Sequence, residues 1–299
     1  MKALFIVNGI SKQYAQVIAD IEAARSSFPN IDVSVESTKA AGDGFRIAHK
    51  HAKESYDAII ACGGDGTMNE VLNGVSLGGT KATTKLGLIA CGSANEFART
   101  TGKKTAKQLL TSLRDHKDNR IDNGIIFQGG LKRRFLNVST AGIGGLVHRQ
   151  IESNKRSIHP WVTYMRAMLW SVLVFQRPTV RVTMNGEVRE TQVTMIAVGK
   201  GNFAAYGLSF TPQSSLSDGQ FGITILYHSN FYQFLTKYFR LRKQAQIDHP
   251  WIEYLKADSI KIEVLEGRLP VESDGEYVNM IDKGETIEFK IEPASVAWL

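Results

Sequence analysis

Apolar and polar positions follow two different periods along the first 120 residues. Short apolar runs typical of strands occupy residues 1–8, 31–38, 57–62 and 85–90, and helical spacing occupies residues 14–27 and 44–54. The run 57–62 is apolar at nearly every position, as in strands that are buried on both faces of a sheet. Strands that alternate with helices predict a doubly wound α/β domain built on a parallel sheet.

A glycine loop joins the run 57–62 to the helix that follows it. The loop consists of Gly63, Gly64, Asp65, Gly66 and Thr67. The helix is marked by apolar residues at i, i+3, i+4 and i+7, namely Met68, Val71, Leu72 and Val75. Thr67 is expected as its N-cap, with Asn73-Gly74 near its end. Glycines at this place let backbone N–H groups approach an anion, which predicts a phosphate site for a nucleotide; a tight turn is the alternative.

Asp65 is unusual in such a loop because a carboxylate repels phosphates. A bridging Mg²⁺, or a hydrogen bond to a ribose or an ordered water, would remove the conflict. A second apolar run, residues 85–90, leads into another glycine loop, residues 91–99, which also opens a helix. Two such junctions in succession predict a ligand crevice at the carboxyl ends of the strands.

The pattern changes near residue 120. From there the strands lie closer together, and runs such as residues 179–184 and 258–265 alternate or are rich in β-branched residues. Turn signals separate the runs at Asn185-Gly186, Glu266-Gly267 and Lys283-Gly284. A mostly antiparallel, β-sandwich-like second domain is therefore expected at residues 125–284, after an α/β nucleotide-binding domain at residues 1–124.

Five motifs in a fixed order resemble the catalytic domain of diacylglycerol kinases, especially the soluble bacterial lipid kinases related to sphingosine and ceramide kinases. They are residues 63–74 (GGDGTMNEVLNG), 92–99 (GSANEFAR), 137–145 (NVSTAGIGG), 217–221 (SDGQF) and 274–276 (DGE). The resemblance extends over nearly the whole chain. It implies a kinase that uses ATP and Mg²⁺, in which the last segment, about residues 285–299, packs back on the first domain.

The resemblance gives the acidic residues separate tasks. Asp65, Glu96 and Asp122 would form a water-bridged network around the catalytic Mg²⁺, while Asp274 would accept the proton of the lipid hydroxyl and Glu276 would orient that residue or a neighbour. Phosphoryl transfer needs this division because it requires both neutralised phosphate charge and an oriented nucleophile. Without the resemblance, Asp122 could be a turn residue and Asp274-Gly275 a hairpin tip.

A separate structural cation is implied at Asp218. The resemblance implies that the Asp218 loop holds this cation with backbone carbonyls, which we expect from Ser215 and Gln220. Its task would be to hold the loop, and it would take no part in the transfer.

Nucleotide contacts are expected at the strand ends and in both glycine loops. They are Asn8, Thr38, Gly63, Gly64, Asp65, Gly66, Thr67, Gly92, Ser93 and Asn95. Asn8 and Thr38 could instead cap the turns that follow their strands. Three departures from the family pattern bear on activity: Gly9 stands where proline is usual, Glu96 replaces an aspartate, and residues 204–207 (AAYG) replace a glycine run.

Composition agrees with a large cytoplasmic enzyme. The chain has 299 residues and is 43% hydrophobic, enough to bury a substantial core. Cys62 and Cys91 lie at the ends of apolar runs and are expected to be reduced core residues rather than disulfide or zinc ligands. The apolar start at residues 1–8 is too short for a signal peptide, and the seven histidines have no metal-binding spacing.

A lipid substrate requires access to a membrane surface. The net charge of +7 favours anionic headgroups and equally other polyanions, but the sequence contains no recognisable RNA or DNA module, so nucleic acid is not expected as a partner. Residues 159–175 are apolar but too short to span a bilayer, and residues 231–243 combine an aromatic stripe with a basic side. That basic side consists of Lys237, Arg240, Arg242 and Lys243. Core packing is the preferred interpretation of both segments.

These patterns together predict an ATP- and Mg²⁺-dependent kinase that phosphorylates a hydroxyl of a diacylglycerol-like lipid, in the cytoplasm and transiently at a membrane. One alternative is a noncatalytic lipid-binding homologue. Another is a different kinase with a GGDG loop, such as an NAD kinase or a phosphofructokinase, against which the later SDG and DGE motifs argue. The sequence leaves the acceptor lipid and the oligomeric state open, a homodimer included.

Overall fold

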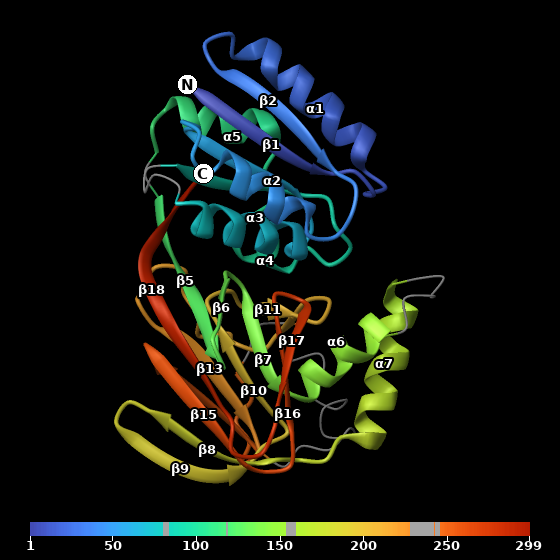
Figure 1. Ribbon diagram of the computed structural model, residues 1–299, viewed down its shortest axis with the longest axis vertical. Coiled ribbons are helices and arrows are strands. Elements are labelled where there is room, and N and C mark those ends of the chain that lie inside the picture. Colours follow the sequence, from blue (N-terminus) through green and yellow to red (C-terminus); the bar gives the residue numbers. More distant parts are fainter. Residues whose placement is uncertain (80–83, 118, 154–159, 228–241, 243–245) are drawn as a thin grey trace. The chain divides into compact units, whose positions relative to one another are not determined.

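Two compact units make up the computed structural model, which describes residues 1–299 except 80–83, 118, 154–159, 228–241 and 243–245 (Figure 1). The first unit consists of Met1–Asn123 and Pro293–Leu299, and the second of Gly124–Glu292. The chain therefore leaves the first unit once and returns to it with its last residues.

The first unit is built on a parallel sheet. Its strands are β1 (Lys2–Asn8), β2 (Asp32–Thr38), β3 (Ala58–Gly63) and β4 (Lys85–Ala90), in the order β2-β1-β3-β4. All three pairings are parallel and in continuous register, with Asn8 opposite Thr38 and Gly63 opposite Ala90. The strand ends named by the sequence patterns therefore lie along one edge of the sheet.

Helices cover both faces of this sheet. Helices α1 (Tyr14–Ser27) and α5 (Ala106–Arg114) share a core with Phe5 and Ile60. Helices α2 (Asp43–His51) and α3 (Asp65–Gly78) pack on each other and contact β1 and β3 from the opposite face (Figure 1). The predicted doubly wound α/β arrangement is confirmed.

Helix α3 differs from its predicted bounds at both ends. It begins at Asp65 with Gly64 as the N-cap residue, so the prediction of Thr67 as N-cap is wrong. It continues past Gly74 to Gly78, and Gly79 ends it in the left-handed conformation with φ of 74°. Gly74 is a packing residue instead: a Cβ there would lie 2.5 Å from the carbonyl oxygen of Phe45 in α2. Close contact between the two helices therefore explains the glycine that the sequence suggested as a stop.

The second unit contains an antiparallel sheet in the order β14-β13-β10-β7-β16-β17. These strands are β7 (Val138–Gly142), β10 (Met195–Gly199), β13 (Phe221–Leu226), β14 (Ile252–Ala257), β16 (Leu269–Ser273) and β17 (Glu276–Ile281). Two very short strands, β11 (Phe203–Ala204) and β12 (Leu208–Ser209), pair with each other.

A second layer faces this sheet across an apolar core. It is formed by β8 (Thr179–Met184), β9 (Glu187–Gln192) and β15 (Ser259–Glu266), with β5 (Asn119–Gln128), β6 (Leu131–Phe135) and β18 (Thr286–Trp298). Ile196 and Phe221 of the first layer share one core with Val182, Ile262 and Phe289 of the second. The predicted β-sandwich-like architecture is confirmed.

The predicted turns also lie where the sequence placed them. Asn185 and Gly186 both have positive φ and connect β8 to β9 in a two-residue hairpin loop. Gly267 and Gly284 have positive φ at the turns after β15 and before β18. Strand β18 pairs with β15 in the second unit, and its end runs into the first unit, where Trp298 pairs with Leu86 of β4.

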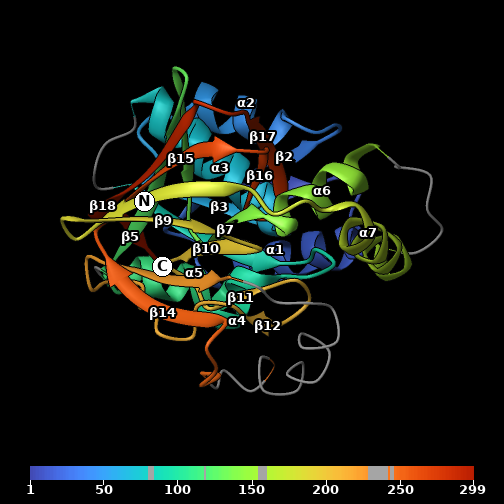
Figure 2. The same cartoon turned by 90° about the horizontal axis from the view of Figure 1, so that it is seen from below.

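Helices α6 (Ile143–Ser153), α7 (Pro160–Val174) and the short α4 (Glu96–Thr101) complete the described elements. Figure 2 shows α6 and α7 side by side at the edge of the second unit. Across the described residues, no helix has the length and apolar character needed to cross a bilayer. The predicted aromatic and basic stripe at residues 231–243 lies outside the described residues except for Arg242.

We expect Phe289→Ala to destabilise the second unit by about 3–5 kcal/mol, because the mutation removes a ring with no exposed surface from the sandwich core. The Phe289 ring lies edge-to-face with Phe135 at 6.2 Å, and this contact is lost with it. Calorimetric unfolding measures the change. Leu131→Ala, at a half-exposed position of the same unit, is the control and should shift the transition little.

Candidate active site

The two glycine loops of the first unit are in direct backbone contact. A Cβ on Gly92 would lie 2.3 Å from the Cα of Gly64, and the N–H of Cys91 donates to the carbonyl of Gly63 at 2.9 Å. A Cβ on Gly63 would lie 2.3 Å from Thr67 Oγ1. These glycines are therefore required by close approach, and they place the start of α3 against the second loop.

Asp65 joins the two loops through its carboxylate. Oδ2 accepts the N–H of Glu96 and Oδ1 accepts the N–H of Phe97, each at 2.9 Å, so Asp65 caps the first turn of α4. Burial raises the pKa of Asp65, while the two backbone bonds and the charge of Arg99 act to lower it; the net shift is upward. Asp65 therefore also holds the second glycine loop to the first, a structural task that the sequence did not indicate. Its predicted role beside the phosphates is separate from this task.

Residues at the strand ends meet beside the first loop. Asn8 Nδ2 lies 3.4 Å from Thr67 Oγ1, and the N–H of Gly9 donates to the carbonyl of Thr38 at 3.2 Å. A Cβ on Gly9 would lie 2.3 Å from that carbonyl oxygen, which accounts for glycine where proline is usual. Ser11 Oγ donates to the carbonyl of Cys91 at 2.8 Å. The predicted nucleotide residues of β1, β2 and β3 are thus brought together.

The second loop is shaped by Asn95. Its side chain accepts the N–H of Gly92 at 2.8 Å and donates to the carbonyl of Gly92 at 2.9 Å, while its backbone has a left-handed φ of 53°. Ser93 is exposed between them. Asn95 therefore fixes the loop conformation, and Ser93 and the loop backbone are the groups that remain accessible to a ligand.

The remaining acids of the predicted magnesium network are buried and tied elsewhere. Glu96 is 5% exposed and pairs with Arg99 at 3.3 Å, and Asp122 is 2% exposed and accepts the N–H of Ala294 at 2.8 Å. Among the described residues, no group of three or more His, Cys, Asp or Glu side chains is arranged to hold a metal ion. A magnesium ion would therefore depend on oxygens from the nucleotide and water for much of its coordination.

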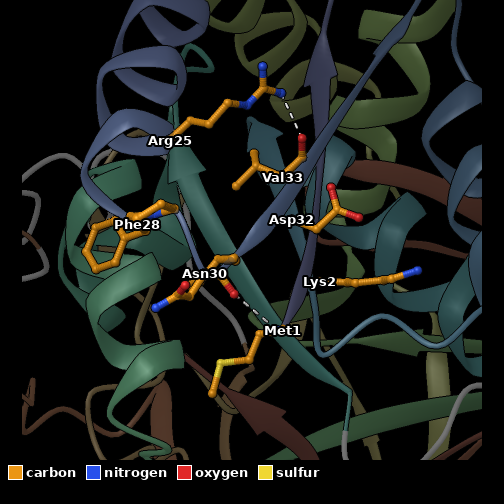
Figure 3. A pocket seen from close by; sticks show the side chains of 9 residues that line it. Met1, Lys2, Arg25, Phe28, Asn30, Asp32 and Val33 are labelled. Carbon is orange, nitrogen blue, oxygen red and sulfur yellow. Dashed lines mark hydrogen bonds between the residues drawn. The ribbon is translucent and has the colours of Figure 1, made fainter.

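A surface hollow of about 710 Å³ lies at the opposite edge of the same sheet (Figure 3). It is lined at the amino ends of β1 and β2 by residues that include Lys2 and Asp32, with Arg25 donating to the carbonyl of Val33 at 2.7 Å. In parallel α/β sheets ligands bind at the carboxyl ends of the strands. This hollow is therefore separate from the glycine-loop site.

In the second unit, the DGE motif forms the turn between β16 and β17. Asp274 has a left-handed φ of 50°, which is uncommon for a residue other than glycine, and is 6% exposed. Its Oδ2 accepts the N–H of Leu136 at 3.1 Å and its Oδ1 accepts that of Asn137 at 2.9 Å. Glu276 is 36% exposed and pairs with Arg133. The two acids of the motif therefore differ: one is enclosed by backbone donors and the other reaches the surface.

A buried acid next to this turn was missed by the sequence analysis. Glu272 is 3% exposed, and its Oε2 accepts the N–H of Gly275 at 3.1 Å and lies 4.0 Å from His148 Nδ1. Burial raises the pKa of Glu272, against lowering by His148 and Thr140. Glu272 follows Val271, which belongs to the sandwich core, and lies beside His148 of α6. The sequence signal for a buried carboxylate was weak, and the histidines were assigned no chemistry.

The segment that replaces the family's glycine run keeps an unusual backbone. Ala205 and Tyr206 have φ of 52° and 61°, followed by Gly207 at 91°. Left-handed conformations cost non-glycine residues about 1–3 kcal/mol each, so packing must offset the strain. The Tyr206 ring contacts the Tyr164 ring of α7 at 5.3 Å. The segment therefore has left-handed backbone conformations, although Ala205 and Tyr206 stand where the family has glycines.

The Asp218 loop does not match the predicted cation site. Lys200 Nζ lies 2.8 Å from Asp218 Oδ1 and 2.8 Å from the carbonyl oxygen of Gln220, while Ser215 is exposed earlier in the loop. Two of the three predicted cation ligands therefore contact an ammonium group.

We expect Asp65→Asn to destabilise the first unit by about 1–3 kcal/mol, although the side chains are nearly isosteric. The amide can present an oxygen to only one of the two N–H donors at Glu96 and Phe97, which leaves the other donor unsatisfied. Thermal unfolding measures the loss. Asp115→Asn, at an exposed pair with Arg114, is the matched control and should leave the melting temperature unchanged. Equal melting temperatures for the two variants would show that Asp65 does not stabilise the unit by capping α4.

Comparisons with known proteins agree with this geometry. Residues 2–126 match the family described as diacylglycerol kinase catalytic domain, and residues 137–297 match the YegS C-terminal NAD kinase beta sandwich-like domain. The chain is 29% identical over 272 residues to a diacylglycerol kinase of Bacillus subtilis, covering 90% of this chain and 86% of that protein. It is 26% identical over 275 residues to a YegS-like lipid kinase of Chromohalobacter salexigens, covering 91% and 85%.

Solved structures show the same fold. A diacylglycerol kinase from Bacillus anthracis superposes with a TM-score of 0.71 at 22% identity, covering 99% of this chain and 96% of that one. Yeast NADH kinase, solved with NADH, superposes with a TM-score of 0.55 at 11% identity, covering 100% and 82%. Both glycine loops and the sandwich with its DGE turn fall within the two matched domains, and the chain therefore belongs to the diacylglycerol kinase and YegS-like lipid kinase family.

Proposed function

We propose that this protein is an ATP- and Mg²⁺-dependent lipid kinase that transfers the γ-phosphoryl group to a hydroxyl of a diacylglycerol-like lipid. The observation that carries the proposal is the pair of glycine loops held together by the Asp65 carboxylate at the start of α3. The N–H groups of the first helical turn have no intrahelical partners and lie at the positive end of the helix dipole, which suits a chain of phosphates.

The first unit would bind the nucleotide through backbone and hydroxyl groups. The loop Gly63–Thr67 offers N–H groups to the phosphates, and Asn8 and Thr38 lie at the neighbouring strand ends. Magnesium would neutralise phosphate charge when bound with the nucleotide. Asp65 and Glu96 supply carboxylates next to the loop. Because Asp65 already accepts backbone N–H groups and Glu96 pairs with Arg99, contact with that ion through water is favoured.

For the proton acceptor, the geometry favours Glu276 over Asp274, which exchanges the roles expected from the sequence. A general base must come within hydrogen-bond reach of the hydroxyl it activates. Both oxygens of Asp274 already accept buried backbone N–H groups, whereas Glu276 is partly exposed beside Arg133. Asp274 would then fix the turn that presents Glu276.

Helix α7 is the proposed membrane-facing element of the second unit. Val162, Leu169, Trp170, Leu173 and Val174 are 42–85% exposed, with Leu173 at the upper limit. Arg166 lies on the same exposed face. The predicted core packing applies only to the opposite face, where Ala167 and Ser171 are buried. An apolar face with a flanking cation suits insertion at the level of lipid headgroups.

The proposed location is the cytoplasm, with transient peripheral binding to a lipid surface. No nucleic-acid partner is proposed. The likeness to yeast NADH kinase concerns the fold alone, so NAD serves as a control substrate and not as a second proposal.

The function is tested by incubating the protein with radiolabelled ATP and mixed micelles that contain diacylglycerol, ceramide or sphingosine. We expect transfer of label to a lipid hydroxyl, dependent on Mg²⁺ and absent with NAD and fructose 6-phosphate. Label on NAD or on the sugar would overturn the lipid assignment. Lipid binding without transfer would instead support the noncatalytic alternative.

We expect Glu276→Gln to lower kcat by about 10²- to 10⁴-fold with the affinity for Mg-ATP unchanged, because the amide cannot accept the proton. Asp274→Asn should lower the melting temperature, because one of the two N–H groups that donate to Asp274 loses its acceptor. Steady-state kinetics and thermal unfolding separate the two effects. If a stably folded Asp274→Asn protein loses kcat while Glu276→Gln keeps it, Asp274 is the base, as the sequence first suggested.

For the membrane surface, we expect the double variant Leu169→Gln with Leu173→Gln to bind anionic phosphatidylglycerol vesicles roughly tenfold more weakly or worse, since two exposed leucines no longer enter the lipid. Cosedimentation with vesicles measures the affinity. Val188→Gln, which removes an exposed apolar side chain from β9, is the matched control. Equal binding by the double variant and the control would exclude α7 as the docking element.

A further inference from the structure

A buried ammonium group lies where the family resemblance placed a structural cation. Lys200 follows β10, and none of its side chain is exposed. Its Nζ is 2.8 Å from Asp218 Oδ1 and 2.8 Å from the carbonyl oxygen of Gln220. These are two of the oxygens expected to coordinate the cation. Because an ion bound to both would overlap Nζ, the lysine and a metal exclude each other at this place.

A second lysine completes the pairing of Asp218. Lys256 Nζ lies 2.8 Å from the other oxygen, Oδ2, but its side chain is 41% exposed. The N–H of Gln220 also donates to Oδ1, at 3.2 Å. Burial alone would raise the pKa of Asp218, yet the bonds from the two lysines and from Gln220 lower it to about 2. Because both oxygens of Asp218 already contact an ammonium group, the attraction of this carboxylate for a divalent cation is weakened.

Lys200 also connects this loop to the DGE turn. The N–H groups of Lys200 and Gly201 both donate to the carbonyl of Asn137, at 2.9 and 3.0 Å. The N–H of Asn137 in turn donates to Asp274 Oδ1 at 2.9 Å. Two hydrogen bonds in succession therefore link the backbone of Lys200 to the buried acid of the turn, and all of these groups belong to the second unit.

We propose that the ammonium group of Lys200 takes the place of the structural cation, so that the Asp218 loop is held by a charge built into the chain and needs no divalent metal. A buried charge of this kind requires close partners, and Lys200 has a carboxylate and a carbonyl at hydrogen-bond distance. The inference concerns the stability of the second unit and stands independently of the proposed kinase activity.

The first test compares the thermal unfolding of the parent protein in EDTA, MgCl₂ and CaCl₂ at matched ionic strength. We expect any change in melting temperature with metal to be the same in the parent and in Asp218→Asn. A rise in melting temperature with either metal that is present in the parent and lost in Asp218→Asn would overturn the proposal, because it would locate a metal at this loop. This arm requires no change at Lys200.

The second test opens the site. Lys200→Ala should lower the melting temperature by roughly 10 °C, because Asp218 and the Gln220 carbonyl lose a buried partner. Millimolar CaCl₂ or MgCl₂ should restore part of this loss, and Lys200→Ala combined with Asp218→Asn should show no restoration. Lys256→Ala removes an ammonium at the same 2.8 Å distance from the surface side and is the matched control, expected to shift the transition by at most about 3 °C without a metal response.

Equal losses for Lys200→Ala and Lys256→Ala would overturn the proposal, since the buried ammonium would then contribute no more than a surface pair. If Lys200→Ala does not fold, Lys200→Met keeps the length of the side chain without its charge. A melting temperature of Lys200→Met equal to that of the parent would also overturn the proposal, and a clear fall would support it.

Discussion

Buried carboxylates require hydrogen-bond donors, and this chain supplies them from its own backbone. Asp65, Asp122 and Asp274 each accept N–H groups from residues that are distant in sequence: residues 96–97, Ala294 and residues 136–137. Leaving such donors and acceptors unpaired would cost about 1–3 kcal/mol for each group, and more for the charge. The positions of the second glycine loop, the returning strand β18 and the DGE turn therefore depend on the same kind of bond.

This arrangement gives a structural task to Asp65 and Asp274, two of the acids that the family resemblance places in the active site. A carboxylate that already accepts two backbone N–H groups cannot rotate freely, so its orientation is fixed before any substrate binds. Asp218 meets the same requirement with the ammonium groups of Lys200 and Lys256 instead of backbone donors. In each case the donor belongs to the protein, so the carboxylate is held in place without a bound ligand.

The sequence predicted the architecture because periodicity and turn chemistry are local properties. The strand ends at Asn8 and Thr38 and the loop at Gly63 come together because parallel strands end at one edge. The identity of the donors to Asp65 and Asp274 could not be predicted, since these bonds join segments 31 to 138 residues apart. Helix α3 was misjudged for a related reason: Gly74 reads as a stop, but its neighbour in space, Phe45, explains it.

The division of β18 between the two units has a consequence for the order of folding during synthesis. Leu299 is fully buried in the first unit and its N–H donates to the carbonyl of Leu86 at 2.9 Å, while Trp298 packs edge-to-face on Phe97. The ribosome delivers residues 293–299 only after the whole second unit has been made. The second unit can therefore reach its native core first, and the first unit receives its last segment only afterwards, so its contacts with residues 293–299 have a large sequence separation.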